Sequence, residues 1–297
     1  MHSVRFHIFK RLRACLISNK RFYCDNKPLV LTQKSNGILY IAINRPDKRN
    51  CVNLETASQL KTAFQLLNDD PTLKVGVLHG IGGNFCAGFD LEELSTGGIN
   101  QDNIPKAPMG PSHMISDKPI IAAIEGYAVA GGLELALLCD MRIVEDTSIL
   151  GVFCRRFGVP LIDGGTVRLP ALIGLSRALD LILTGRIVKG KEAVDIGLAS
   201  QCVNLGCAIG VATSVAKCIA KFPQECMKAD RRSAYHSVFD AKSLQDALDF
   251  EYENGKSIIA SESVEGAARF VKDGVGRHGK FQLDSRATMN QLTEPDL

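Results

Sequence analysis

The chain has 297 residues, a formal net charge of +3 and a hydrophobic content of 45%. This composition suffices for the packed core of one large or two small domains, and the near-neutral charge gives no electrostatic reason to expect nucleic acid as the main partner. No apolar run reaches the roughly 20 residues that a membrane-spanning helix needs, so we expect a soluble protein with no membrane partner.

The ten cysteines are scattered along the chain and form no CxxC motif. Several of them, including Cys139, Cys202 and Cys218, lie inside apolar runs. This distribution predicts reduced, largely buried thiols in an intracellular protein and not a disulfide framework.

The first 24 residues are basic, contain serine and hold no acidic residue before Asp25. Such a composition is typical of a mitochondrial transit peptide and predicts a protein of the mitochondrial matrix. The alternative is a disordered basic tail on a cytoplasmic protein.

From Pro28 onwards the pattern becomes globular. Apolar runs, amphipathic periodicity and turn residues predict, in chain order, a strand at Gly37–Ile43, a polar turn at Asn44–Asn50, a helix at Leu54–Leu67 and a buried strand at Lys74–His79. A glycine-punctuated turn follows and ends at Asp90, which is placed as the N-cap of a short helix. The long loop Ser95–Ser112 is expected to form a lid or wall of a substrate site.

The stretch Ile120–Asp140 organises the rest of the chain. It predicts a buried strand at Ile120–Ile124 and, after a glycine-rich turn, a helix that begins near Gly131 and is apolar almost all round. The free N–H groups at such a helix start can hold an anion. Glu134 lies one turn into this buried helix, which suggests a chemical role; the alternative is a carboxylate that reaches the surface or pairs with an arginine.

The second half of the sequence is mainly helical. It predicts short strands at Met141–Val144, Ile149–Val152 and Ala199–Val203, and helices that start near Gly164 and at Ser176–Leu183, Gly190–Ile196, Ala208–Lys221 and Leu244–Ile258. Alternating strand and helix units followed by a helical part indicate an α/β architecture with a helical appendage.

Three ordered motifs, at Phe85–Leu94, Gly126–Asp140 and Thr184–Val203, resemble the crotonase, or enoyl-CoA hydratase/isomerase, superfamily. The resemblance covers about Leu31 to Phe281. It implies a crotonase-like ββα spiral core that binds acyl-CoA, which we assign to residues 28–205, and a C-terminal helical oligomerisation region at residues 206–283 that makes homotrimers or dimers of trimers. Residues 1–24 would be the transit-like segment and residues 284–297 a disordered tail.

The resemblance also implies catalytic positions. Two backbone N–H groups bind the thioester carbonyl oxygen in this family, and the matching residues are Ala87 and Gly131. Such donors stabilise the enolate that forms when a proton leaves, or water adds, next to a thioester. Glu134 matches one of the two glutamates that act as acid and base in the hydratases.

The second glutamate position is occupied by Cys154, which is a departure from the hydratase pattern. Four interpretations are open: Glu134 works alone, Asp163 is the second carboxylate, Cys154 takes part, or activity is lost. We favour the first two. The structural alternatives are an N-cap or arginine-partner role for Asp163 and a packing role for Cys154.

For CoA itself, the resemblance implies contacts of Arg45 and Lys48 with the phosphate and pantetheine region. It places Asp90, together with Ala87, in the segment that lines adenine, and it matches Lys280 and Phe281 to C-terminal positions that reach a CoA. Coenzyme A is part of the thioester substrate, so no separate cofactor and no metal are expected.

We therefore expect an enoyl-CoA hydratase-like lyase of fatty acid or acyl-CoA metabolism that adds water to a 2-enoyl-CoA thioester through an oxyanion-stabilised enolate. The alternatives are an enoyl-CoA isomerase, an acyl-CoA decarboxylase, and a non-catalytic CoA- or RNA-binding member. RNA binding is disfavoured because the basic residues near Lys217–Arg232 alternate with acidic and apolar ones, as on ordinary helix faces.

Overall fold

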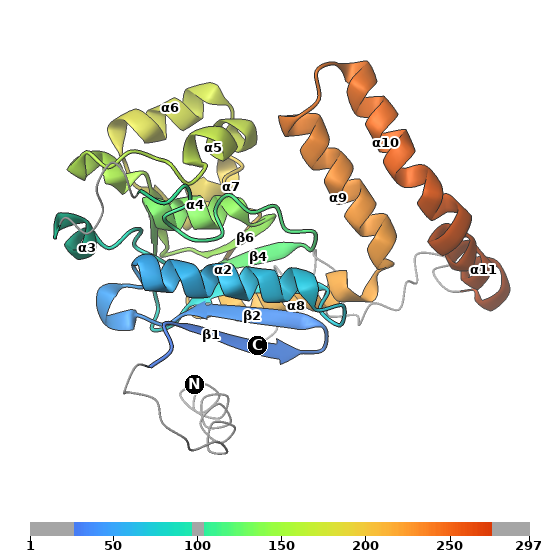
Figure 1. Cartoon of the computed structure of the whole chain (residues 1–297), viewed down its shortest axis with the longest axis horizontal. Coiled ribbons are helices and arrows are strands. Elements are labelled where there is room, and N and C mark those ends of the chain that lie inside the picture. Colours follow the sequence, from blue (N-terminus) through green and yellow to red (C-terminus); the bar gives the residue numbers. More distant parts are fainter. Residues whose placement is uncertain (1–26, 97–103, 275–297) are drawn as a thin grey trace.

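The computed structural model describes residues 27–96 and 104–274 (Figure 1). The expectations for residues 1–24, for Lys280 and Phe281, and for the tail at 284–297 lie outside the described residues. Among the residues described, no helix is both long and apolar enough to cross a membrane.

Two sheets form the centre of the described part. The larger one consists, in hydrogen-bonded order, of β1 (Val30–Ser35), β2 (Ile38–Ile43), β3 (Val75–Gly80), β4 (Ile120–Ile124), β6 (Met141–Glu145) and β9 (Gln201–Val203). Its strands are parallel except for the antiparallel edge pair β1–β2. The smaller sheet consists of β5 (Tyr127–Val129), β7 (Ile149–Gly151) and β8 (Val188–Lys189).

Helices cover both faces of the larger sheet. In chain order the helices are α2 (Leu54–Asp69), α3 (Leu91–Ser95), α4 (Gly131–Leu138), α5 (Gly165–Ile173), α6 (Leu175–Thr184), α7 (Gly190–Asp195), α8 (Ala208–Lys221), α9 (Gln224–Phe239), α10 (Leu244–Ile258) and α11 (Val264–Asp273). Short 3-10 turns lie at η1 (Pro46–Lys48) and η2 (Phe153–Phe157), and a π-helical segment, η3 (Ile259–Ser263), joins α10 to α11.

The alternation of side chains along β4 shows how the sheet divides two cores. Ile121 and Ala123 belong to the cluster that packs on α8, whereas Ile120, Ala122 and Ile124 belong to the cluster that contains α2 and α4. Because successive side chains of a strand point to opposite faces, one uninterrupted apolar run supplies both layers. The catalytic candidate helix α4 is thereby held on one face of the sheet.

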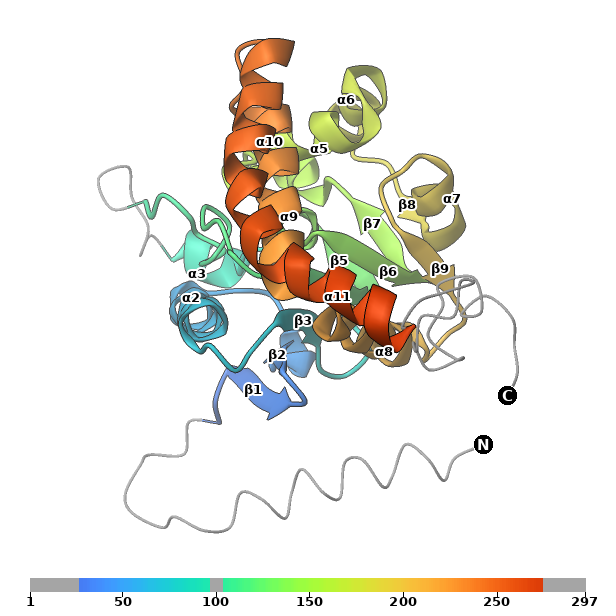
Figure 2. The ribbon, with the colours of Figure 1, turned by 90° about the vertical axis from the view of Figure 1, so that its right-hand side faces the viewer.

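Helices α9, α10 and α11 form an arm beside the α/β core (Figures 1 and 2). Asp140, directly after α4, anchors the arm: its carboxylate accepts from Arg231 Nε at 2.7 Å and from the Tyr235 hydroxyl at 3.0 Å. The arm continues the helical appendage that the sequence predicts, although α9 and α11 are not among the predicted helices. In α9 Ala229 alone is buried, so this helix lacks the apolar stripe by which helices are recognised.

Candidate active site

A cavity of about 400 Å³ opens at the N-terminus of α4. Its walls are mainly apolar and come from α3, residues 104–109, β5 and the segment from η2 to Asp163. The residues predicted to be catalytic all line this cavity: Ala87, Gly131, Glu134 and Asp163. Cys154 lines it as well. Five residues from three separate stretches of the sequence therefore meet at one site. An apolar cavity with a few polar groups is the usual form of a small-molecule site.

Glu134 is 3% exposed and faces this cavity. Its Oε1 accepts from the backbone N–H groups of Asp163 at 3.0 Å and Gly165 at 2.8 Å, while Oε2 has no hydrogen-bond partner among the described residues. Burial raises the pKa of the carboxyl group to about 7, against the opposing effect of the two hydrogen bonds. The carboxyl group is thus held in place by one oxygen and can take or give a proton at neutral pH.

Gly131 is the first residue of α4, as the sequence predicts. Its N–H group has no acceptor in the described part of the chain. A Cβ here would lie 2.7 Å from Met109 Sδ, so the Met109 side chain would have to shift to admit any larger residue at this position. The preceding residue, Ala130, has a φ of 53°, a conformation that non-glycine residues rarely adopt and that fixes the entry into the helix.

The structure contradicts the assignment of Ala87 as the second donor. The Ala87 N–H group donates to Arg49 O at 3.0 Å and is not available to a substrate. Two residues further on, Phe89 lines the cavity, and its N–H group has no acceptor among the described residues. Gly88 brings this segment against α4, since a Cβ on Gly88 would lie 3.1 Å from Gly131 N. The free pair of donors is therefore Phe89 and Gly131.

The sequence did not predict the role of Phe89, because residue identity does not determine the direction in which a backbone N–H group points. In an extended segment successive N–H groups point to opposite sides. In a regular strand the N–H groups of Ala87 and Phe89 would therefore point to the same side. The left-handed φ of 101° at Gly88 interrupts the strand, so the two N–H groups point in different directions. That glycine is the one signal in the sequence that the direction changes here.

Cys154 lies in η2, is 6% exposed and lines the cavity near Glu134. Burial, and then the charge of Glu134, raise the pKa of its thiol above the usual value. The thiol is therefore protonated at neutral pH. It supplies neither a carboxylate nor a thiolate to the site.

Asp163 is also buried, and its side chain turns towards the cavity wall. Its Oδ1 accepts from the Met109 N–H group at 3.0 Å and from the Ser112 hydroxyl. The N-cap position of α5 is occupied by Gly164, so the N-cap alternative for Asp163 is wrong. Asp163 reaches Glu134 through its backbone N–H group and holds the end of the 104–112 loop through its carboxylate.

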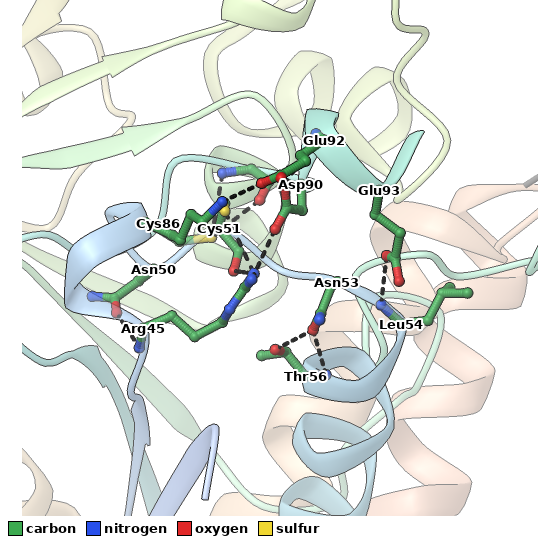
Figure 3. Close-up of polar contacts among 12 residues, drawn as sticks. Arg45, Asn50, Cys51, Asn53, Leu54, Thr56, Cys86, Asp90, Glu92 and Glu93 are labelled. Atoms are coloured by element: carbon green, nitrogen blue, oxygen red, sulfur yellow. Dashed lines mark hydrogen bonds and ion pairs between the residues drawn. The ribbon is translucent and has the colours of Figure 1, made fainter. Parts of the chain in front are cut away.

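Two of the residues assigned to CoA, Arg45 and Asp90, are paired with each other (Figure 3). Arg45 forms a 2.8 Å ion pair with Asp90, and both side chains are mostly buried. Lys48 pairs with Glu92 at the surface, where both side chains are largely exposed. Arg45 is thus neutralised inside the protein, whereas Lys48 remains accessible to a phosphate group that competes with Glu92.

Within residues 27–96 and 104–274 no three His, Cys, Asp or Glu side chains gather where they could hold a metal ion. The eight cysteines of these ranges are all free thiols.

The model of the enoyl-CoA hydratase/isomerase family matches residues 33–277, most of the chain. The chain belongs to the enoyl-CoA hydratase/isomerase family. It is therefore an enzyme of that family, and the crotonase resemblance and the α/β spiral fold predicted from the motifs are confirmed.

Individual relatives agree with this assignment. The (E)-benzylidenesuccinyl-CoA hydratase of Thauera aromatica is 34% identical over 69% of this chain and 81% of that protein. A mouse protein, enoyl-CoA hydratase domain-containing protein 2, mitochondrial, is 36% identical over 58% of this chain and 60% of that protein. The crystal structure of the enoyl-CoA hydratase EchA1 from Mycobacterium marinum superposes with a TM-score of 0.77 at 33% identity and covers 83% of this chain and 97% of that one.

Proposed function

We propose that this member of the family hydrates a 2-enoyl-CoA thioester. The observation that carries the proposal is the buried Glu134 carboxyl group, with one oxygen held by two N–H groups, the other free, and a pKa of about 7. It lines the same cavity as the free N–H groups of Phe89 and Gly131. A proton carrier and a pair of oxyanion donors are the two parts that addition of water to a conjugated thioester needs.

The proposed reaction runs through an enolate. The N–H groups of Phe89 and Gly131 bind the thioester carbonyl oxygen. Ionised Glu134 takes a proton from a water molecule, whose oxygen bonds to the β-carbon, and the electron pair of the double bond moves to the α-carbon and the bound oxygen. Glu134 then returns its proton to the α-carbon, so that the elements of water have been added and no separate cofactor is consumed.

Hydration of crotonyl-CoA by the full chain, followed by loss of the conjugated-enoyl absorbance, tests the proposal. We expect Glu134→Gln to lower kcat by about 100-fold or more while CoA still binds, because the amide cannot accept the proton. Asp163→Asn is the matched comparison, since it changes a carboxylate that holds the loop. Undiminished turnover of Glu134→Gln would remove Glu134 from the reaction.

A specific observation favours a second candidate, enoyl-CoA isomerisation. The Cys154 thiol at the position of the second glutamate is protonated, and the Asp163 carboxylate is held to the loop through Oδ1, whereas Glu134 lies in α4 one turn after the Gly131 donor. Moving a proton from one carbon to another needs a single carboxylate. Conversion of a 3-enoyl-CoA to the conjugated isomer, in the absence of hydration, would decide for this reaction.

We further propose a mitochondrial location and self-association. The basic segment at residues 1–24 supports the first, together with relatives from Arabidopsis thaliana and mouse whose names include the word mitochondrial. The exposed apolar side chains of the arm support the second. Import into isolated mitochondria and light scattering of the purified protein test the two proposals.

A further inference from the structure

We propose that the Arg45–Asp90 ion pair is the positioning element that aims the Phe89 N–H group into the cavity, and that Arg45 is not a ligand of CoA. This inference rests on the proposed function, in which Phe89 is an oxyanion donor. It assigns a role to two residues that lie outside the cavity lining, and it replaces the role that the family resemblance implies for both.

The segment that carries Phe89 is attached to the turn after β2 by three backbone hydrogen bonds. Ala87 N donates to Arg49 O at 3.0 Å, Val52 N to Gly88 O at 2.8 Å and Asp90 N to Val52 O at 2.8 Å. Phe89 is the bridge partner of Val52, and in this pairing the flanking groups of Gly88 and Asp90 make the bonds. The N–H group of Phe89 itself is therefore turned away from Val52 and is left for a ligand.

The Arg45–Asp90 ion pair adds a side-chain connection between the same two segments (Figure 3). The Arg45 guanidinium donates through one terminal nitrogen to Asp90 Oδ2 at 2.8 Å and through the other to Cys51 O at 2.6 Å. Asp90 Oδ1 accepts from Glu92 N at 3.1 Å, at the start of α3. One planar fork thus joins the residue before Val52 to the residue after Phe89, and only an arginine presents two donors in that fixed geometry.

The turn that carries Arg45 is itself fixed to the loop that follows β3. Asn50 is fully buried and accepts from Arg45 N at 2.8 Å, while its amide donates to Ile81 O at 2.9 Å and Asn84 O at 2.6 Å. Any shift of Arg45 would break this network. The guanidinium is therefore a rigid reference for Asp90, and hence for the direction of the neighbouring Phe89 N–H group.

The CoA-binding alternative makes a different demand on Arg45. A phosphate ligand needs an accessible cation, whereas the side chain of Arg45 is 14% exposed and that of its partner Asp90 is 10% exposed. Binding CoA would require breaking a buried charge pair and leaving Asp90 without its counter-ion, which is costly. A positioning role requires no such rearrangement.

The experiment compares Arg45→Lys and Asp90→Asn with Glu92→Gln in the full chain. Glu92 belongs to the neighbouring exposed ion pair between the same two segments, so its substitution controls for loss of a surface charge contact. Three quantities are measured for each protein: kcat and KM with crotonyl-CoA, the Kd of free CoA, and the enolate absorbance of bound acetoacetyl-CoA, whose ionisation reports the strength of the oxyanion donors.

We expect Arg45→Lys and Asp90→Asn to lower kcat by about 10- to 100-fold and to reduce the enolate absorbance, with the Kd of CoA changed less than twofold, because a small displacement of a donor is sufficient for such a loss. Glu92→Gln should resemble the wild type in kcat and in enolate absorbance, and it should not raise the Kd of CoA, because it removes the carboxylate that competes with phosphate for Lys48. An unchanged stoichiometry of CoA binding in each variant serves as the check that the variant is folded.

Two results would overturn the positioning role. One is an unchanged kcat and enolate absorbance in both variants; the other is a raised Kd of CoA with an unchanged kcat, which is the behaviour of a phosphate ligand. A wild-type protein that neither hydrates crotonyl-CoA nor polarises acetoacetyl-CoA would overturn the proposed function itself, and this role of the ion pair with it.

Discussion

At the scale of single residues, the site depends on the Glu134 carboxyl group, whose ionised form is disfavoured by burial. Glu134 is 3% exposed and its pKa rises from 4.5 to about 7, mainly through burial. The folded protein therefore binds more protons than the unfolded chain between these two values. Stability falls as pH rises from about 4.5 through about 7 and then levels off.

This linkage predicts that Glu134→Gln stabilises the protein at pH 8 while it abolishes turnover. A shift of this size corresponds to a free energy of unfolding of the order of 3 kcal/mol, since one pKa unit is about 1.4 kcal/mol. The glutamine keeps an oxygen for the N–H groups of Asp163 and Gly165 but carries no charge. Urea unfolding at pH 5 and pH 8 measures the difference, and an equal gain at both values would contradict the linkage.

Because Cys154 occupies the position of the second glutamate of the hydratases, we predict that replacing it with glutamate increases hydratase activity. Cys154→Glu places a second carboxyl group near Glu134, and the like charge should raise the pKa of Glu134 further. A second acid/base group typically contributes 10²-fold or more, so we expect crotonyl-CoA hydration to rise by at least tenfold relative to isomerisation of a 3-enoyl-CoA. Cys154→Gln, of the same size without the charge, is the control and should show no such gain.

At the scale of elements, the sequence predicted those whose pattern is set by burial. Helix α2 has a regular apolar face and an Asn53 cap that accepts from Thr56 N, and its start at Leu54 is confirmed. The edge strand β1 was not predicted because the last four of its six residues are polar and exposed. The sequence therefore shows no alternation of apolar and polar residues there. Elements defined by tertiary contacts, such as β1 and α9, leave a weak signal in the sequence.

The same contrast holds within the candidate site. The start of α4 and the isolated Glu134 were readable because a glycine pair and one acid interrupt an apolar run. The engagement of Arg45 with Asp90 joins positions 45 residues apart, and no local pattern reports it. The residue types thus indicated the position of the candidate active site. The direction of the backbone and the long-range pairing of side chains determine which N–H groups and charged groups are available to a substrate.

Two glycines in helices give a matched test of close approach. A Cβ on Gly132 would lie 2.1 Å from Cys86 O, a backbone atom, whereas nothing lies within 4 Å of a Cβ on Gly210 in α8. We expect Gly132→Ala to destabilise the protein by about 1–3 kcal/mol and to lower turnover, because α4 must move away from the Phe89 segment. Gly210→Ala should stabilise it by about 0.5–1 kcal/mol. Thermal unfolding and crotonyl-CoA turnover measure both.

At the scale of the whole molecule, the arm of α9, α10 and α11 presents exposed apolar side chains. Leu244, Leu248 and Tyr252 recur every four residues along α10 and are 77%, 49% and 67% exposed. Phe250, stacked on His236, and Asn254, bonded to Ala229 O, mark the side of α10 that faces α9. Since 100° separates successive helical residues, Leu248 and Tyr252 lie on the opposite side.

This face predicts self-association through the arm. Exposed stripes of this kind mark contact surfaces in soluble proteins, and the family resemblance implies a homotrimer or a dimer of trimers. We expect Leu248→Lys to shift the protein to a smaller species in light scattering, because a lysine cannot be buried unpaired in an apolar contact. Lys242→Glu, in the exposed turn before the same helix, changes a charge without removing apolar surface and should leave the mass unaltered. A wild-type protein that is already monomeric at micromolar concentration would exclude the arm as an association surface.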